Sequence, residues 1–315
     1  ITSEIWNYGS ISRPGNRITD IIWEGLGYGY EFGPFICAEV PVAPQSHQDA
    51  YTKEENGDTT WYARVISDGL VTDPERSPDG SEYWTWEPLA YSDDGIYFAD
   101  PNSDKIPTSS DIDRDFDGKP DSWADDWYNP ILKDYVWPGD LRQGASNADE
   151  EAFFVCDDRR NKEFEYYPFP DDSSRKGLGL QIEYRYYQWA NPLAEDIIFL
   201  IYKVTNKSEK DLHEVIFGMW GDPHIGGPSD WSDDLSFFDT DLNMVYCWDE
   251  DGSASGSART PGFFGYKFLE SPGNPFDGID NDNDGMVDES RSNGIDDDND
   301  WDIEKDDIGI DGVPN

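Results

Sequence analysis

Aspartates recur at every second position in two stretches near the end of the chain, 277–289 and 293–304. Carboxylates at this spacing, followed by a glycine, let a short loop turn several oxygens toward one hard divalent cation. A loop of the EF-hand type takes calcium ligands from positions 1, 3, 5, 7, 9 and 12, with glycine at position 6 for the sharp turn. The first stretch therefore predicts a calcium site that turns at Gly285. Its candidate ligands are Asp280, Asp282, Asp284, the carbonyl of Met286, and Asp288.

The second stretch repeats the spacing but has Trp301 where the glycine would stand, which makes its tight turn harder to form. Its candidate ligands are Asp296, Asp298, Asp300 and Glu304. A solvated acidic tail is the alternative interpretation of such a charge run. Apolar residues at recurring places favour the metal loops, because a disordered tail does not need them; they include Ile279, Val287, Ile295, Trp301 and Ile303.

A third loop of this kind is predicted upstream, at 111–126, with Gly118 at the turn. Its candidate ligands are Asp113, Asp115, Asp117, the carbonyl of Lys119, and Asp121. Position 12 is Ala124, which cannot bind a metal through its side chain, but Asp125 and Asp126 follow directly and offer further oxygens. An ordinary polar turn is the alternative to a calcium site here.

A looser group of aspartates lies between 222 and 251, and its spacing matches no motif. Solvated loop residues and a further metal site explain this group equally well. Its members are Asp222, Asp230, Asp233, Asp234, Asp239, Asp241, Asp249 and Asp251.

The loop series resembles the thrombospondin type 3 repeat, and more loosely the dockerin loop, in which calcium loops follow one another with little regular structure. It departs from the EF-hand because Arg291 stands at position 12 of the first copy. The order of segments across 80–290 is also similar to that of a family of long secreted bacterial proteins. The segments concerned read DGKPDSW (117–123), ADEEAFFVCDD (148–158), FLIYKVTN (199–206), FGMWGDP (217–223) and FDGIDNDNDGMVDE (276–289). This resemblance implies an extracellular, calcium-bearing β protein and implies no activity.

The chain of 315 residues carries 68 acidic and 23 basic residues, which gives a net charge of −45. Such self-repulsion destabilises a compact state unless counter-ions bind. Several bound Ca²⁺ ions would each neutralise two charges, so metal binding and folding become linked. The same charge argues against nucleic acid and anionic membranes as partners, since these require clustered lysine and arginine. We also expect no membrane insertion, because no sufficiently long apolar run is present.

The residue pattern predicts a mostly β chain, because 29 glycines and 21 prolines accompany few helical periodicities. Aromatic residues make up 15% of the chain and supply ample apolar area for a core. We expect an immunoglobulin-like antiparallel β-sandwich with long loops over 1–270, followed by calcium-loop repeats over 271–315. Strands are expected within 21–42 and at 61–71, 177–189, 196–205, 212–220, 242–248 and 262–269, with a polar loop at 43–60 and an ordered loop region at 84–138.

Sequence motifs for catalysis are absent. The chain contains no G-x-S-x-G or H-E-x-x-H motif and no Cys/His spacing suited to zinc. His224, in the glycine-rich stretch 218–227, is interpreted as a loop residue rather than a general base. Cys37, Cys156 and Cys247 lie in apolar, strand-like runs, which favours buried free thiols. We therefore expect no enzyme.

These observations predict a secreted, calcium-stabilised structural protein that self-associates as a subunit of an extracellular assembly, filament or surface layer. Secretion is expected because calcium is millimolar outside the cell and because the chain begins at Ile1, as if a leader had been removed or lay outside it. The alternative is a carbohydrate-binding module, alone or attached to a glycoside hydrolase, since aromatic faces stack on sugars. An exposed coplanar row of aromatic side chains would favour sugar binding and their burial would favour a scaffold; the side chains concerned are Trp84, Trp86, Trp123, Trp127, Tyr128, Trp137, Trp220 and Trp231.

Overall fold

The computed structural model describes residues 1–12, 21–44, 46–55, 57–69, 76–92, 98–100, 105–139, 144–228, 230–254 and 259–269. The predicted C-terminal repeats over 271–315 lie outside these residues. The candidate ligands among them are Asp280, Asp282, Asp284, Met286, Asp288, Asp296, Asp298, Asp300 and Glu304.

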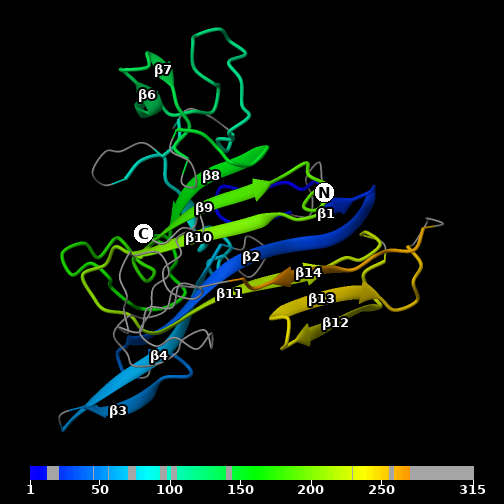
Figure 1. Ribbon diagram of the computed structural model, residues 1–315. Helices are drawn as coiled ribbons and strands as arrows, with labels where there is room; N and C mark the ends of the chain where they lie inside the picture. The colour runs from blue at the N-terminus through cyan, green and yellow to red at the C-terminus, as the bar shows by residue number, and fades with distance from the viewer. Residues whose placement is uncertain are drawn as a thin grey trace, which may run out of the picture.

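The prediction of a mostly β chain is confirmed, and every described strand pairing is antiparallel. The largest sheet is built around one long strand, β2, which pairs with β1, β4 and β11, while β3 pairs with β4 (Figure 1). Its strands are β1 (Ile21–Trp23), β2 (Leu26–Pro41), β3 (Tyr51–Glu55), β4 (Asp58–Asp68) and β11 (His213–Pro223).

Three further sheets complete the strand inventory of the described residues. The second sheet has the order β10-β9-β8-β5, from β5 (Glu87–Pro88), β8 (Glu150–Asp157), β9 (Leu180–Gln188) and β10 (Phe199–Asn206). The third contains β12 (Asp234–Asp239), β13 (Met244–Asp249) and β14 (Phe264–Lys267). A 3-10 turn, η1 (Asp125–Trp127), precedes the short pair of β6 (Tyr128–Asn129) and β7 (Asp134–Tyr135).

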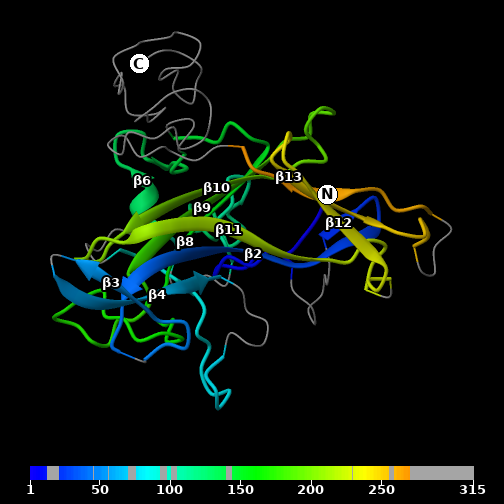
Figure 2. The same cartoon turned by 90° about the horizontal axis from the view of Figure 1, so that it is seen from below.

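The main core contains buried side chains from both larger sheets, whose strands β2, β11 and β8 to β10 lie close together in Figure 1 and Figure 2. Alternate side chains of each strand point to one face of its sheet, and apolar ones from both sheets join one cluster. Phe154 of β8 and Tyr184 of β9 stack with ring centroids 4.3 Å apart. Both belong to a buried cluster that also contains Phe32, Ile36, Ala38 and Val40 of β2, Ala63 and Val65 of β4, and Leu180, Ile182 and Tyr186 of β9.

The second face of β8 is also buried, because the segment 105–139 packs over it. Phe153 and Val155 point to this side and contact a tryptophan cluster made of Trp123, Trp127 and Trp137. Backbone pairing fixes the segment in place: the N–H of Ser109 donates to the carbonyl of Glu151 at 2.8 Å. We call 105–139 the cover segment. It carries the predicted upstream calcium loop, so that loop sits directly on the fold's second sheet.

The three cysteines lie on β2, β8 and β13 and are free thiols; Cys156 is buried, and Cys37 and Cys247 are half-buried. Burial raises the pKa of each thiol, so these side chains stay protonated and behave as small apolar groups. Within the described ranges, no helix has the length and apolar character needed to cross a membrane.

Candidate metal centre

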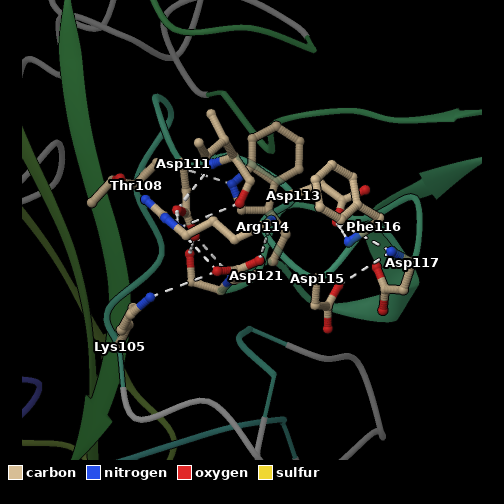
Figure 3. A network of polar contacts seen from close by, with 12 residues as sticks. Lys105, Thr108, Asp111, Asp113, Arg114, Asp115, Phe116, Asp117 and Asp121 are labelled. Atoms are coloured by element: carbon tan, nitrogen blue, oxygen red, sulfur yellow. Dashed lines mark hydrogen bonds and ion pairs between the residues drawn. The ribbon is translucent and has the colours of Figure 1, made fainter.

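The upstream loop brings three of its predicted ligands together (Figure 3). Asp113, Asp115 and Asp117 each offer a carboxylate oxygen, and these oxygens lie within 4.8 Å of one another. Calcium binds oxygens at about 2.3–2.6 Å, so two ligands of one ion lie at most about 5 Å apart. The separations of the three oxygens are thus compatible with a single calcium ion. We call these three residues the aspartate triad.

The triad also turns the loop that carries it. Asp113 accepts hydrogen bonds from the backbone N–H groups of Phe116 at 2.6 Å and Asp117 at 3.2 Å through Oδ1, and from Gly118 at 2.9 Å through Oδ2. Phe116 and Gly118 have φ values of 64° and 96°, which lie in the left-handed region. The predicted glycine is thus needed at 118 for its backbone conformation. A carboxylate oxygen has two lone pairs, so Oδ2 of Asp113, which accepts one N–H, keeps a lone pair that a cation could use.

One predicted ligand, Asp121, has other partners in the structure, and the side chain of another predicted residue, Lys119, forms ion pairs. Asp121 accepts the backbone N–H of Arg114 at 2.8 Å and the Arg114 guanidinium at 3.0 Å, and these contacts lower the pKa of Asp121. Lys119 was predicted to contribute its carbonyl; its Nζ donates to Asp100 and Asp125, each at 2.9 Å. These pairs place positive charge next to the triad and offset part of the negative charge of the loop.

One residue that anchors the loop was not predicted from the sequence. Asp111 accepts the backbone N–H and the hydroxyl of Ser122 at 2.9 and 2.6 Å, and the Arg114 guanidinium at 2.6 Å. Although burial opposes it, the Ser122 hydroxyl and Arg114 hold the pKa of Asp111 at about 2. Asp111 therefore stays ionised and closes the base of the loop. No spacing rule indicates this role, since it depends on Ser122 folding back across the loop.

The base of the loop joins the cover segment to β8. The indole Nε1 of Trp123 donates to the carbonyl of Thr108 at 2.9 Å, and Thr108 forms a β-bridge with Ala152 of β8. The ring centroids of Trp123 and Trp137 are 5.4 Å apart. Trp123 and Thr108 thus connect the triad loop to β8. An ordered triad loop therefore favours the packing of the cover segment on one face of the second sheet.

Most of the tryptophans considered for sugar binding belong to the core. Trp86 is 1% exposed and Trp137 is 2% exposed, and Trp123 and Trp127 are also buried. Two others, Trp220 and Trp231, are 41% and 60% exposed. Burial of this kind indicates that Trp86, Trp123, Trp127 and Trp137 serve as scaffold, whereas Tyr128 is 45% exposed.

An open groove of about 980 Å³ lies where β5 meets the connection that follows β8. Two of its basic side chains are paired with acidic neighbours. Arg160 contacts Glu87 at 2.6 Å and Lys162 contacts Glu82 at 2.5 Å. The groove thus has little net charge with which to attract an ionic substrate.

Comparison with protein-family models, with curated proteins and with solved structures found no match. The function is therefore inferred from the geometry of this chain alone.

Proposed function

We propose that this protein is a secreted structural subunit that calcium stabilises and that self-associates through open strand edges. The observation that carries the proposal is the state of β10 and β11. Within the described residues, each of these strands pairs on one side only, β10 with β9 and β11 with β2. Tyr202 of β10 contacts Phe217 of β11, with ring centroids 5.1 Å apart, so the two open edges are neighbours.

The open strands expose apolar side chains that a closed sandwich would bury. On β11, Val215 is 51% exposed, Ile216 is 58% exposed and Phe217 is 40% exposed. On β10, Ile201 and Val204 are 39% and 38% exposed. Consecutive residues of a strand point to opposite faces, so both faces of β11 are accessible at this end. An unpaired strand with apolar faces is a template for pairing with another chain.

Calcium is expected to act at the aspartate triad and on the overall charge of the protein. Subunits that each carry −45 repel one another, and bound calcium both reduces this repulsion and rigidifies the cover segment. A loop of this type suits millimolar calcium, which is found outside cells. The immunoglobulin-like arrangement of the two larger sheets, and calcium binding by the C-terminal repeats, belong to the same proposal.

We predict that removing the triad reduces the stabilisation of the protein by calcium. Asparagine keeps an oxygen for the turn but loses the charge, so Asp113→Asn with Asp115→Asn leaves the loop able to form. A site with a dissociation constant of about 0.1–1 mM would contribute about 1–2 kcal/mol at 5 mM calcium, and the double variant should lose this part. Thermal unfolding with calcium and with EGTA measures the difference. Asp79→Asn, in an exposed turn, is the control and should retain the full calcium effect.

We predict that one lysine on the open edge prevents assembly. Ile216→Lys places a charge on β11, where it opposes edge-to-edge pairing and burial of the apolar face. Light scattering and electron microscopy in millimolar calcium should show oligomers or filaments for the wild type and monomers for the variant. Ile131→Lys adds the same charge at an 89% exposed position in the β6–β7 turn and should still assemble. A wild type that stays monomeric with and without calcium would contradict the proposal.

A further inference from the structure

A second group of carboxylates gathers far from the triad loop in sequence. Asp230 and Asp233 lie in the connection between β11 and β12, and Asp249 is the last residue of β13. Each offers an oxygen, and the three oxygens lie within 4.8 Å of one another. Strand pairing creates this proximity: Asp234, the first residue of β12, is the register partner of Asp249 at the end of the third sheet (Figure 1).

Asp249 supplies a second, independent observation that indicates a ligand. It is only 6% exposed, yet none of the residues that the structure describes donates a hydrogen bond to its Oδ2. Its Oδ1 does accept N–H groups, from Gly252 and from Ser253 at 3.0 Å. A buried carboxylate oxygen without a donor is costly unless a cation compensates it. Asp234 has the same feature, because its Oδ1 is buried and has no donor among the described residues.

Lysine and arginine side chains do not pair with these two carboxylates among the described residues. In the described part of the chain, Asp233, Asp234 and Asp249 form no ion pair with lysine or arginine. The triad loop differs, because Arg114, Lys105 and Lys119 surround its acidic residues. Carboxylates such as Asp249 and Asp234, which hold a buried oxygen without a donor and have no lysine or arginine partner among the described residues, favour a bound cation over a solvated surface.

We propose that Asp230, Asp233 and Asp249 bind one divalent cation, calcium, at the end of the third sheet. Carboxylates alone, with no histidine or cysteine in the group, are the ligand set that hard cations prefer. The oxygen separations fit one calcium shell by the same distance argument as for the triad. Gly226 permits the arrangement, since a Cβ at that position would lie 2.4 Å from Oδ2 of Asp230.

This site fastens the third sheet to the rest of the molecule. The loop that bears Asp230 docks on β2, where the N–H of Gly226 donates to the carbonyl of Gly27 at 3.0 Å. Next to it, Ile225 is fully buried in a small core with Leu26 and Ala254. A cation shared between this loop and the end of β13 would therefore join the β12–β14 sheet to the long central strand.

Hydrogen–deuterium exchange of the full chain tests the site with calcium itself as the probe. The amides of Ile225, Gly252 and Ser253 donate to Asp234 and Asp249 and report local opening. With a dissociation constant of about 0.1–1 mM, 5 mM CaCl₂ should slow their exchange about 6- to 50-fold relative to EGTA. The slowing should persist in the Asp113→Asn/Asp115→Asn variant, so failure of the triad site and failure of this one are distinguishable.

The variant Asp230→Asn/Asp233→Asn changes two half-buried residues and spares the buried Asp249. It should abolish the calcium effect on these amides and leave that on the triad loop intact. Asp239→Asn/Asp241→Asn removes the same charge at the β12–β13 turn, outside the cluster, and should keep the effect. If the double variant does not fold, Asp233→Asn alone should weaken the effect at least about fivefold. No slowing in the wild type, or equal slowing in the Asp230→Asn/Asp233→Asn variant, would overturn the proposal.

Discussion

Replacing Asp158 with alanine is expected to lower the free energy of unfolding by about 3–5 kcal/mol. Asp158 is fully buried and accepts the backbone N–H groups of Leu178, Gly179 and Leu180 at 2.6, 3.1 and 2.8 Å. It also accepts the hydroxyl of Ser67 at 3.1 Å. Alanine would leave these donors buried without an acceptor, and each such donor costs about 1–3 kcal/mol before the structure relaxes. Urea unfolding measures the loss.

The size of this effect follows from where Asp158 lies. It comes directly after β8, while its partners belong to β4 and to the start of β9, so a single carboxylate connects both large sheets. The backbone around Asp158 is closely packed, because a Cβ on Gly177 would lie 2.2 Å from the Asp158 carbonyl oxygen. Burial raises the pKa of Asp158 to about 7, so unfolding is best compared at pH 8, where the carboxylate is ionised.

A matched variant distinguishes the loss of the buried hydrogen bonds of Asp158 from the effect of removing any carboxylate. Asp172→Ala removes an exposed aspartate that also accepts a backbone N–H and a hydroxyl, both from Ser174, at 3.0 and 2.5 Å. Water can replace the carboxylate at that position, so the urea midpoint should hardly change. If Asp158→Ala and Asp172→Ala lowered the free energy of unfolding equally, the buried hydrogen bonds of Asp158 would not be the source of the stability.

The local sequence pattern was sufficient to predict strands that have one apolar face or a run of β-branched residues. The predicted strands at 177–189, 196–205 and 212–220 correspond to β9, β10 and β11. The predicted polar loop at 43–60 was wrong, because it contains β3 and the start of β4. A signal was present there: Asn56-Gly57 separates the two strands, Gly57 has a φ of 89°, and this dipeptide favours a tight hairpin turn.

Two other strands were not assigned as elements from the sequence, although the run around Cys156 in β8 was recognised as strand-like. All residues of β8 after its first are buried, so it shows no alternation; its second face is covered by tryptophans that come from the distant cover segment. Strand β12 is short, and its apolar side chains, including Phe237 and Phe238, are exposed, so burial does not mark it. In both cases the strand depends on partners remote in sequence rather than on its own periodicity.

The same distinction explains which site residues could be found. The aspartate triad is local, so the spacing of Asp113, Asp115 and Asp117 was enough to predict that their carboxylates meet. The group that includes Asp230 and Asp249 is assembled by the β12–β13 pairing across 19 positions, and no motif spacing could reveal it. Carboxylate groups that are close in sequence can therefore be predicted from spacing, whereas groups that strand register brings together require the fold.

Replacing Arg185 with methionine is expected to destabilise the protein by about 3–5 kcal/mol. The side chains of Arg185 and Glu151 are 7% and 1% exposed, and Nη1 lies 2.7 Å from Oε1 of Glu151. The guanidinium carbon also lies 4.3 Å from the ring centroid of Phe153 and its Nε donates to Glu183 at 3.0 Å. Methionine fills most of the volume but leaves Glu151 as a buried charge with no cation. Equilibrium unfolding in urea measures the cost.

A double variant tests whether the buried charge is the cause. In Arg185→Met/Glu151→Leu the uncompensated carboxylate is gone, so at least about half of the lost stability should return, as expected when a buried pair is replaced by apolar residues. Arg259→Met breaks the exposed pair with Glu24, at 2.8 Å, and should have little effect. If the double variant were less stable than Arg185→Met alone, packing rather than charge would explain the loss. Because the backbone of Glu151 pairs with Ser109 of the cover segment, the buried pair also supports the strand on which the triad loop rests.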